Sequence, residues 1–222
     1  MRFAALLLST SLALGLAPRA AEAADPIGVW LEAAVRAEPV DDLRITVSNQ
    51  VRFTDSFERL GRVLPEVSLA YRLNGWLRLD GGYRFTADKR SEGDFRYLHR
   101  VFADARMRWE PLRDLELGYR SRLQTETTRD QSDRRQNQPE WRNRVSATFA
   151  MHDVLQPCLS WELFAPFSNG GTLRAAEWRL KLGLGLDLGA HTVEPFYHYQ
   201  RDIEVDPGQG EHVLGLGYRF DL

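Results

Sequence analysis

The sequence predicts an all-β fold: an antiparallel meander transmembrane β-barrel of about 10 to 12 strands, preceded by a cleaved signal peptide. Three observations lead to this prediction. Apolar and polar residues alternate with a period of two along most of the chain. Short connections between the alternating segments are followed by longer polar ones, as in outer-membrane barrels. The first residues have the form of an export signal.

Composition excludes several other classes of protein. The chain has 43% hydrophobic and 27% charged residues, which is too balanced for a disordered protein. A formal net charge of −2 gives no basic excess, so we expect no nucleic-acid partner. A single cysteine, Cys158, excludes a disulfide scaffold and a multi-cysteine metal site. We therefore expect no cofactor and no metal.

The N-terminal segment predicts export from the cytoplasm. Arg2 provides a positive charge, Phe3 to Leu16 is apolar, and Ala21-Glu22-Ala23 fits the small-x-small pattern before a signal-peptidase cut. An apolar run of about 14 residues is too short to cross roughly 30 Å of hydrocarbon as a helix. We therefore divide the chain into a signal peptide, residues 1–23, and a barrel, residues 24–222.

Period-two alternation defines the candidate strands of the first half of the chain. In the segment that begins at Leu43, odd positions are apolar except Asn49, and even positions are polar. The dipeptide Asn74-Gly75 is the preferred sequence of a two-residue hairpin turn, so it separates two strands. The expected strands are Ile27–Ala37, Leu43–Phe53, Arg62–Leu73, Gly75–Phe85, Phe95–Glu110 and Asp114–Gln124.

The second half of the chain continues the same alternation after a long polar segment. Thr125 to Pro139 is rich in charged residues, and we interpret it as a solvated loop. We interpret two further segments as loops, Pro166 to Gly171 and Asp202 to Gly210. The expected strands are Glu140–Met151, Leu155–Phe164, Leu173–Leu188, Thr192–Arg201 and Glu211–Leu222.

Alternation alone does not decide which face points outward, since a soluble barrel buries the apolar face that a membrane barrel exposes. The apolar stripe from Trp178 to Leu188 would rise roughly 25 Å when tilted, the height of the lipid-facing band. Aromatic residues collect near strand ends, as in interfacial girdles. The final strand resembles the carboxy-terminal assembly signal of bacterial outer-membrane proteins, with Leu222 in place of the usual aromatic. These features favour the outer membrane over a soluble secreted ligand-binding barrel.

The strand count leaves two arrangements open. The alternating segments number eleven, whereas bacterial single-chain barrels have an even number of strands. Either Ile27 to Ala37 lies outside a ten-stranded wall, or an unrecognised strand makes twelve.

Several short blocks resemble a known family. They are Val29-Trp30-Leu31-Glu32, Tyr71-Arg72-Leu73, Gly82-Tyr83-Arg84-Phe85, Tyr97-Leu98-His99-Arg100, Gly118-Tyr119-Arg120-Ser121-Arg122-Leu123 and Trp141-Arg142-Asn143-Arg144. They look like the recurring blocks of a bacterial domain-of-unknown-function family of predicted outer-membrane β-barrels. The resemblance implies the fold and the location, and it implies no catalytic residue.

The inward face is the strongest chemical feature of the predicted barrel. Arginine can hold carboxylates in fixed geometry where charges are crowded. This face is consistent with an envelope structural protein whose lumen is closed by salt bridges, or with a narrow channel for a small anionic solute. The candidate lumen network consists of Arg78, Arg84, Arg100, Asp104, Arg120, Arg122, Arg142, Arg144, Glu162, Glu177 and Arg179.

Catalytic patterns are weak, so we expect no enzyme and name no catalytic residue. His198 and His212 flank the last long loop with Glu211 nearby, and they would carry an outer-rim hydrolase, the alternative function. Cys158 has no matched histidine and is expected to be a lumen residue. The expected partners are outer-membrane lipid, the barrel-assembly machinery during biogenesis and a small anionic solute.

Overall fold

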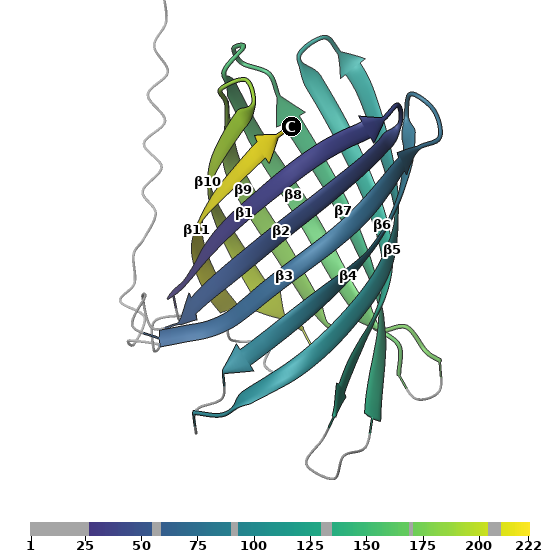
Figure 1. The fold of residues 1–222 in the computed structure, drawn as a ribbon, viewed down its shortest axis with the longest axis vertical. Helices are drawn as coiled ribbons and strands as arrows, with labels where there is room; N and C mark the ends of the chain where they lie inside the picture. The colour runs from purple at the N-terminus through teal and green to yellow at the C-terminus, as the bar shows by residue number, and fades with distance from the viewer. Residues whose placement is uncertain (1–26, 55–58, 90–92, 130–134, 169–170, 204–209) are drawn as a thin grey trace, which may run out of the picture.

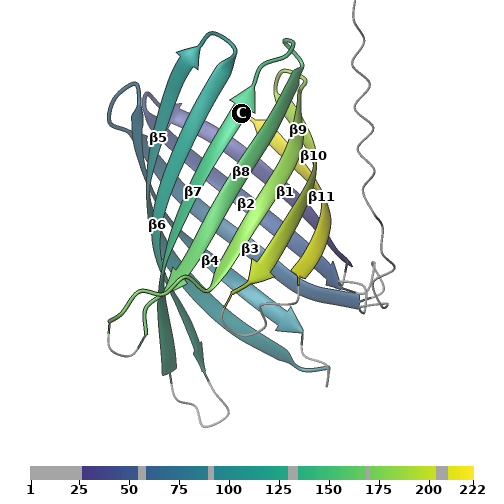
Figure 2. The ribbon, with the colours of Figure 1, turned by 180° about the vertical axis from the view of Figure 1, so that it is seen from behind.

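The computed structural model describes residues 27–54, 59–89, 93–129, 135–168, 171–203 and 210–222. They form eleven tilted strands that close into a barrel (Figures 1 and 2). The strands are β1 Ile27–Val40, β2 Leu43–Thr54, β3 Arg59–Arg72, β4 Leu77–Lys89, β5 Phe95–Leu112, β6 Leu115–Arg129, β7 Arg135–Phe149, β8 Leu155–Pro166, β9 Glu177–Asp187, β10 His191–Asp202 and β11 Gly210–Asp221. Among these residues, no helix is long and apolar enough to cross a membrane.

The barrel closes in a way that sequence reasoning did not anticipate. Each strand pairs in antiparallel fashion with the next, and β1 pairs with β11 in parallel, from Ile27 opposite His212 to Arg36 opposite Asp221. An up-and-down wall with an odd number of strands must contain one parallel pair. The expectation of an even number is therefore wrong for the described residues, and β1 belongs to the wall.

Two connections also differ from the sequence-based expectation. Asn74 and Gly75 lie in a wider turn between Arg72 and Leu77, in which the Asn74 Oδ1 atom accepts hydrogen bonds from the backbone N–H groups of Trp76 and Leu77. Gly75 does not adopt positive φ, so the two-residue turn does not form.

The expected loop from Thr125 to Pro139 is mostly strand. Pairing between β6 and β7 continues from Leu115 opposite Phe149 to Arg129 opposite Arg135. The ends of these two strands reach below the rest of the wall in Figures 1 and 2. Backbone hydrogen bonding along the hairpin extends the strands in spite of their polar sequence.

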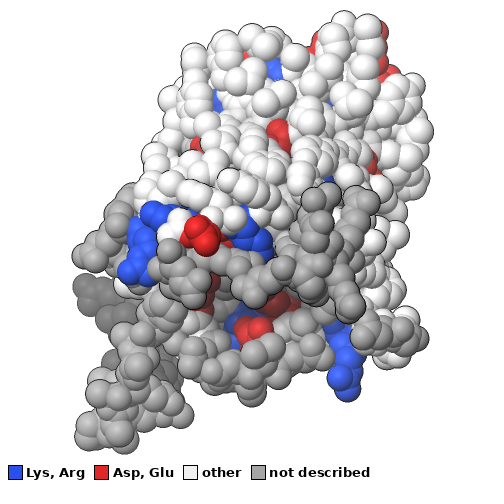
Figure 3. Space-filling model, turned by 60° about the horizontal axis from the view of Figure 1, so that its bottom comes forward, with Lys and Arg blue, Asp and Glu red and all other residues white. Residues whose placement is uncertain are grey.

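The two ends of the barrel are distinct. One end carries the tight turns, including those that follow β1, β3 and β7, and β11 ends there. The other end carries the longer connections, and β1 begins there. We call them the short-turn end and the long-loop end. Figure 3 views the long-loop end, where charged side chains gather around the opening while the wall above is mostly uncharged.

The outer face of the wall is largely apolar, and several of its polar groups pair with aromatic side chains. Leu182 and Leu214 are about half exposed, at 51% and 54%. The Tyr119 hydroxyl donates to Asn143 Oδ1 at 2.7 Å, and the Trp141 indole donates to Ser121 Oγ at 2.8 Å. Such pairing satisfies polar groups that would otherwise be costly against lipid. This is the reverse of a soluble barrel, which exposes its polar face.

A small apolar cluster fills one side of the lumen. Trp30, Phe196 and Val213 pack together and are almost fully buried. Gly215 lies opposite Phe196 on the neighbouring strand, and a Cβ atom there would collide with the Phe196 ring. The glycine therefore provides the space that an inward aromatic side chain requires.

Candidate functional site

Two chambers inside the lumen lie toward opposite ends of the barrel, and a third cavity of about 230 Å³ lies beside them, lined by Glu32, Arg84 and Arg219 among others. The short-turn chamber has a volume of about 470 Å³ and is lined by residues of the β3–β4 turn. The long-loop chamber has a volume of about 540 Å³. Arg106, Arg120 and Arg144 line both chambers. These three side chains therefore lie at the boundary between the chambers.

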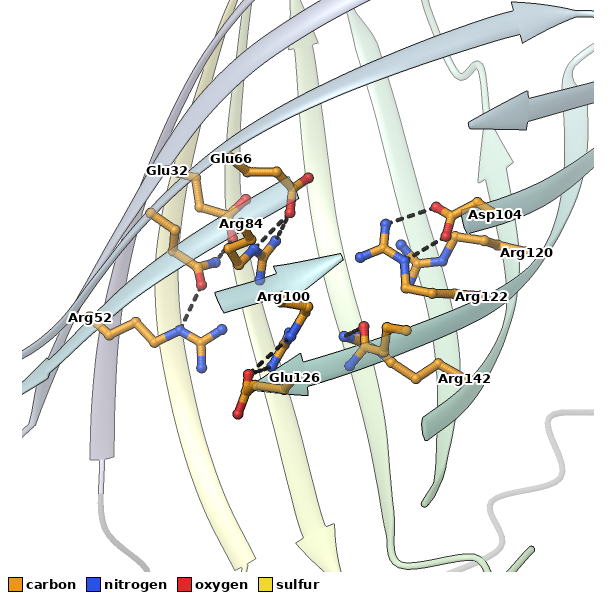
Figure 4. Close-up of polar contacts among 12 residues, drawn as sticks. Glu32, Arg52, Glu66, Arg84, Arg100, Asp104, Arg120, Arg122, Glu126 and Arg142 are labelled. Atoms are coloured by element: carbon orange, nitrogen blue, oxygen red, sulfur yellow. Dashed lines mark hydrogen bonds and ion pairs between the residues drawn. The ribbon is translucent and has the colours of Figure 1, made fainter. Parts of the chain in front are cut away.

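A buried ion pair anchors one side of this boundary. Arg122 on β6 donates two hydrogen bonds to Asp104 on β5, from Nε to Oδ1 at 2.6 Å and from the guanidinium terminus to Oδ2 at 2.8 Å (Figure 4). The Asp104 side chain is 0% exposed. Arg106 donates to the same carboxylate at 3.1 Å. This two-pronged geometry fixes the orientation of both partners.

Glu162 on β8 anchors the other side. Its Oε1 atom accepts hydrogen bonds from Arg120 and from Arg142, the latter through Nε at 3.0 Å. Arg144 lies directly opposite Glu162 in the register between β7 and β8. One buried carboxylate therefore faces three arginines. The inward alternation of neighbouring strands brings these residues together although they are separated by up to 42 positions.

The long-loop chamber has more evenly paired charges. Arg84 donates to Glu66 at 2.7 Å, and Arg100 donates to Glu126 at 2.5 Å through its terminal nitrogen (Figure 4). Arg52 donates to the amide oxygen of Gln50. Each of these contacts joins residues on the inward faces of the strands.

Aromatic rings and cations alternate along the other wall of this chamber. The Arg52 guanidinium lies 3.6 Å from the centroid of the Trp30 ring, and Lys181 Nζ lies 4.2 Å from that of Phe196. His198 meets Trp30 edge-on and stacks on Phe196. A guanidinium group that stacks on a ring keeps its N–H edge available for hydrogen bonds. Sequence reasoning missed Trp30 and Phe196 as lumen residues, although their inward parity could have indicated it.

The structure brings five of the eleven expected lumen-network residues together. Asp104, Arg120, Arg122, Arg142 and Glu162 form the boundary cluster. Arg144 lies at the same boundary, opposite Glu162, and the other five lie apart from the cluster. Arg84 pairs with Glu66, Arg100 with Glu126 and Arg179 with Glu177, and no ion pair forms at Arg78 or Arg144 within the described part of the chain.

The two histidines proposed for a rim hydrolase lie on opposite faces of the wall. His198 is buried inside the lumen, at 2% exposure. His212 points outward and shares a hydrogen bond with the hydroxyl of Tyr197. They therefore do not meet at one site. Cys158 faces the lumen and contacts Glu194 through Sγ at 3.3 Å.

No group of three or more histidine, cysteine or carboxylate residues suited to a metal ion occurs in the described ranges. The lumen donors are instead almost all guanidinium groups, which are suited to carboxylate and phosphate oxygens.

Comparisons with known proteins agree with the fold. A family model described as "Protein of unknown function (DUF2490)" matches residues 27–208. The solved structure of the NanC porin is similar with a TM-score of 0.55 and 14% identity, covering 90% of this chain and 100% of that one. The outer-membrane OmpT of Vibrio cholerae has a TM-score of 0.44 and 13% identity, over 73% of this chain and 52% of that one. No curated protein sequence matches the chain. The first structure supports an outer-membrane-type β-barrel fold.

Proposed function

Because the chain belongs to the DUF2490 family, whose description gives no activity, we propose a function from the lumen itself: a narrow channel for small anions across the outer membrane. The apolar outer face would contact lipid, and the barrel-assembly machinery would insert it.

The observation that carries this proposal is the boundary between the chambers. Arg106, Arg120 and Arg144 line both sides of it, so within the described residues side chains, and no backbone segment, separate the two cavities. Changes of side-chain rotamer are fast compared with movements of backbone segments, although buried ion pairs slow them. A small solute could therefore pass when these arginines rearrange around the fixed carboxylates of Asp104 and Glu162.

The size of the barrel is consistent with a narrow passage. Eight-stranded barrels have interiors that side chains fill, whereas 16-stranded porins leave an aqueous channel. Eleven strands lie between these limits. Arginines dominate the boundary, and their positive charge favours anions over cations.

A second role, in envelope structure, is favoured by the burial of the boundary ion pairs. The side chains of Asp104 and Glu162 are 0% and 6% exposed, so their contacts could brace the wall in a permanently closed barrel. Buried ion pairs that are held by two hydrogen bonds exchange partners less readily than exposed ion pairs.

Planar bilayer recordings distinguish the two roles. We expect the purified barrel to conduct, with a reversal potential in a KCl gradient that shows preference for chloride. Arg144→Gln should reduce this preference because it removes a charge from the boundary. Arg62→Gln is the matched control, since Arg62 is 46% exposed and lies away from the boundary.

The outcomes separate clearly if each variant is first shown to be folded by its shifted migration on an unboiled gel. Folded protein that never conducts would overturn the channel and support the structural role. A cation-preferring pore would also contradict the proposal. Equal effects of Arg144→Gln and Arg62→Gln would show that the boundary does not control selectivity.

A further inference from the structure

A row of five arginines, one from each of five neighbouring strands, follows the hydrogen-bonding direction across the wall. The pairing registers place Arg72 opposite Arg78, Arg78 opposite Arg106, Arg106 opposite Arg120, and Arg120 opposite Arg144. All five line the short-turn chamber. We call them the arginine row. At about 4.8 Å between strands, the row spans roughly 19 Å.

Such a row is unfavourable unless something else compensates it, because like charges directly opposite one another destabilise a sheet. Three buried carboxylates of the described chain contact the row: Asp80 and Asp104 pair with Arg106, and Glu162 pairs with Arg120. Asp104 and Glu162 are shared with arginines outside the row. Asp104 is held by two hydrogen bonds from Arg122, and Glu162 by hydrogen bonds from Arg142. Among the described residues, Arg78 and Arg144 have no ion-pair partner. The row is therefore short of negative charge.

Other arginines of the chamber add to the imbalance. Arg36, Arg44, Arg108 and Arg219 also line it, whereas Glu116 is the one carboxylate among the described lining residues. Arg36 and Arg219 share one carboxylate, that of Asp221. Pairs at this end have exposed carboxylates: the Glu38 side chain, paired with Arg44, is 46% exposed, and that of Asp42, paired with Arg72, is 45% exposed. Exposed pairs contribute little to stability because water screens them, so an entering anion can replace them.

We propose that the short-turn chamber is a binding site for a small multivalent anion, held by the arginine row and entered from the short-turn end. Guanidinium groups bind carboxylate and phosphate oxygens through paired N–H donors. A chamber of about 470 Å³ accommodates a compact molecule with several such groups. A monovalent ion would compensate only a small part of the row.

The long-loop chamber does not offer the same site. Its arginines face carboxylates on neighbouring inward positions, as in the pairs of Arg84 with Glu66 and Arg100 with Glu126. These side chains are less than about one-quarter exposed, so their pairs are less readily displaced. The two chambers thus differ in chemistry, and the inferred site is confined to the short-turn side.

Binding to the detergent-solubilised barrel tests the inference without requiring conduction. Isothermal titration with inorganic tripolyphosphate and with citrate should give saturable binding that weakens as salt rises. Acetate should not saturate at the same concentrations. The double variant Arg72→Gln/Arg78→Gln should weaken binding about tenfold or more, because each arginine supplies charge-assisted hydrogen bonds.

A matched control uses arginines of the other chamber. Arg62→Gln/Arg96→Gln removes two comparably exposed guanidinium groups that pair with Asp88 near the long-loop end. We expect binding within about twofold of the parent protein, because these groups lie outside the site. Preference for tripolyphosphate would identify a phosphate site, and preference for citrate a carboxylate site; either supports the inference.

Two results would overturn the site: no saturable binding of either probe, or equal losses in the row variant and the control. Both variants should retain heat-modifiable migration, so misfolding is detected separately. A barrel that binds tripolyphosphate and is silent in bilayers would retain this site while losing the proposed channel. A barrel that conducts without binding either probe would retain the proposed channel and overturn this site.

Discussion

Glu162 illustrates how a single residue controls the polar interior. Its carboxylate accepts hydrogen bonds from Arg120 and Arg142 and lies across from Arg144, and its side chain is 6% exposed. Removing charge from the centre of a buried cluster leaves the surrounding charges uncompensated. The same change at an exposed pair has little effect, because water compensates the partner.

This contrast gives a stability prediction. Glu162→Gln should lower the free energy of unfolding by about 3 kcal/mol or more. Glu116→Gln should lower it by less than about 1 kcal/mol, since Glu116 is 45% exposed and lies 3.7 Å from Arg108. Urea unfolding in lipid vesicles, followed by tryptophan fluorescence, measures both. Similar losses for the two variants would show that the Glu162 cluster does not brace the wall.

At the scale of strands, local sequence was sufficient for most of the wall. Alternation placed all eleven strands within a few residues of their observed positions, because side chains on a strand point alternately to its two faces. The extended β6–β7 hairpin was missed because its polar residues resemble a loop. Its strands are held by cross-strand backbone hydrogen bonds, which composition does not record.

The partners of each strand could not be read from local sequence. The parallel contact between β1 and β11 joins the two ends of the described wall, and no local pattern specifies it. Likewise, the inward parity of Arg78 and Arg120 was predictable, but their places in one row depend on the registers of β4, β5 and β6. The network members were therefore identified without their partners.

Cross-linking tests the parallel closure directly. In a Cys158→Ser background, Ala33→Cys and Tyr218→Cys should oxidise to a disulfide, because these residues are register partners on β1 and β11. Ala33→Cys with Leu214→Cys is the control, as Leu214 pairs with Val29, about 13 Å along the strand. Gel mobility before and after reduction reports the bond. Equal yields for both pairs would contradict the register, and a β1 outside the wall would give neither.

Across the whole molecule, charged residues mainly face the interior and apolar residues mainly face outward. The charged residues, which balance to a formal net charge of −2, largely line the lumen or gather at its ends, and the apolar residues cover the outside. The near-neutral total thus conceals an uneven distribution, with paired charges in the long-loop chamber and an excess of arginine in the short-turn chamber. A soluble barrel with the same composition would have the opposite arrangement.

Arginine substitutions at two depths test whether lipid surrounds the wall. Leu182 and Leu188 are similarly exposed, at 51% and 57%, but Leu182 lies in the middle of β9 and Leu188 just beyond its short-turn end. Against lipid, Leu182→Arg should lower the free energy of unfolding by about 2–4 kcal/mol, and Leu188→Arg by about 0–1 kcal/mol. Denaturant unfolding in vesicles gives both values. Water would accept arginine equally at two exposed positions, so a depth-dependent loss requires a hydrocarbon layer around β9, and equal small losses would contradict it.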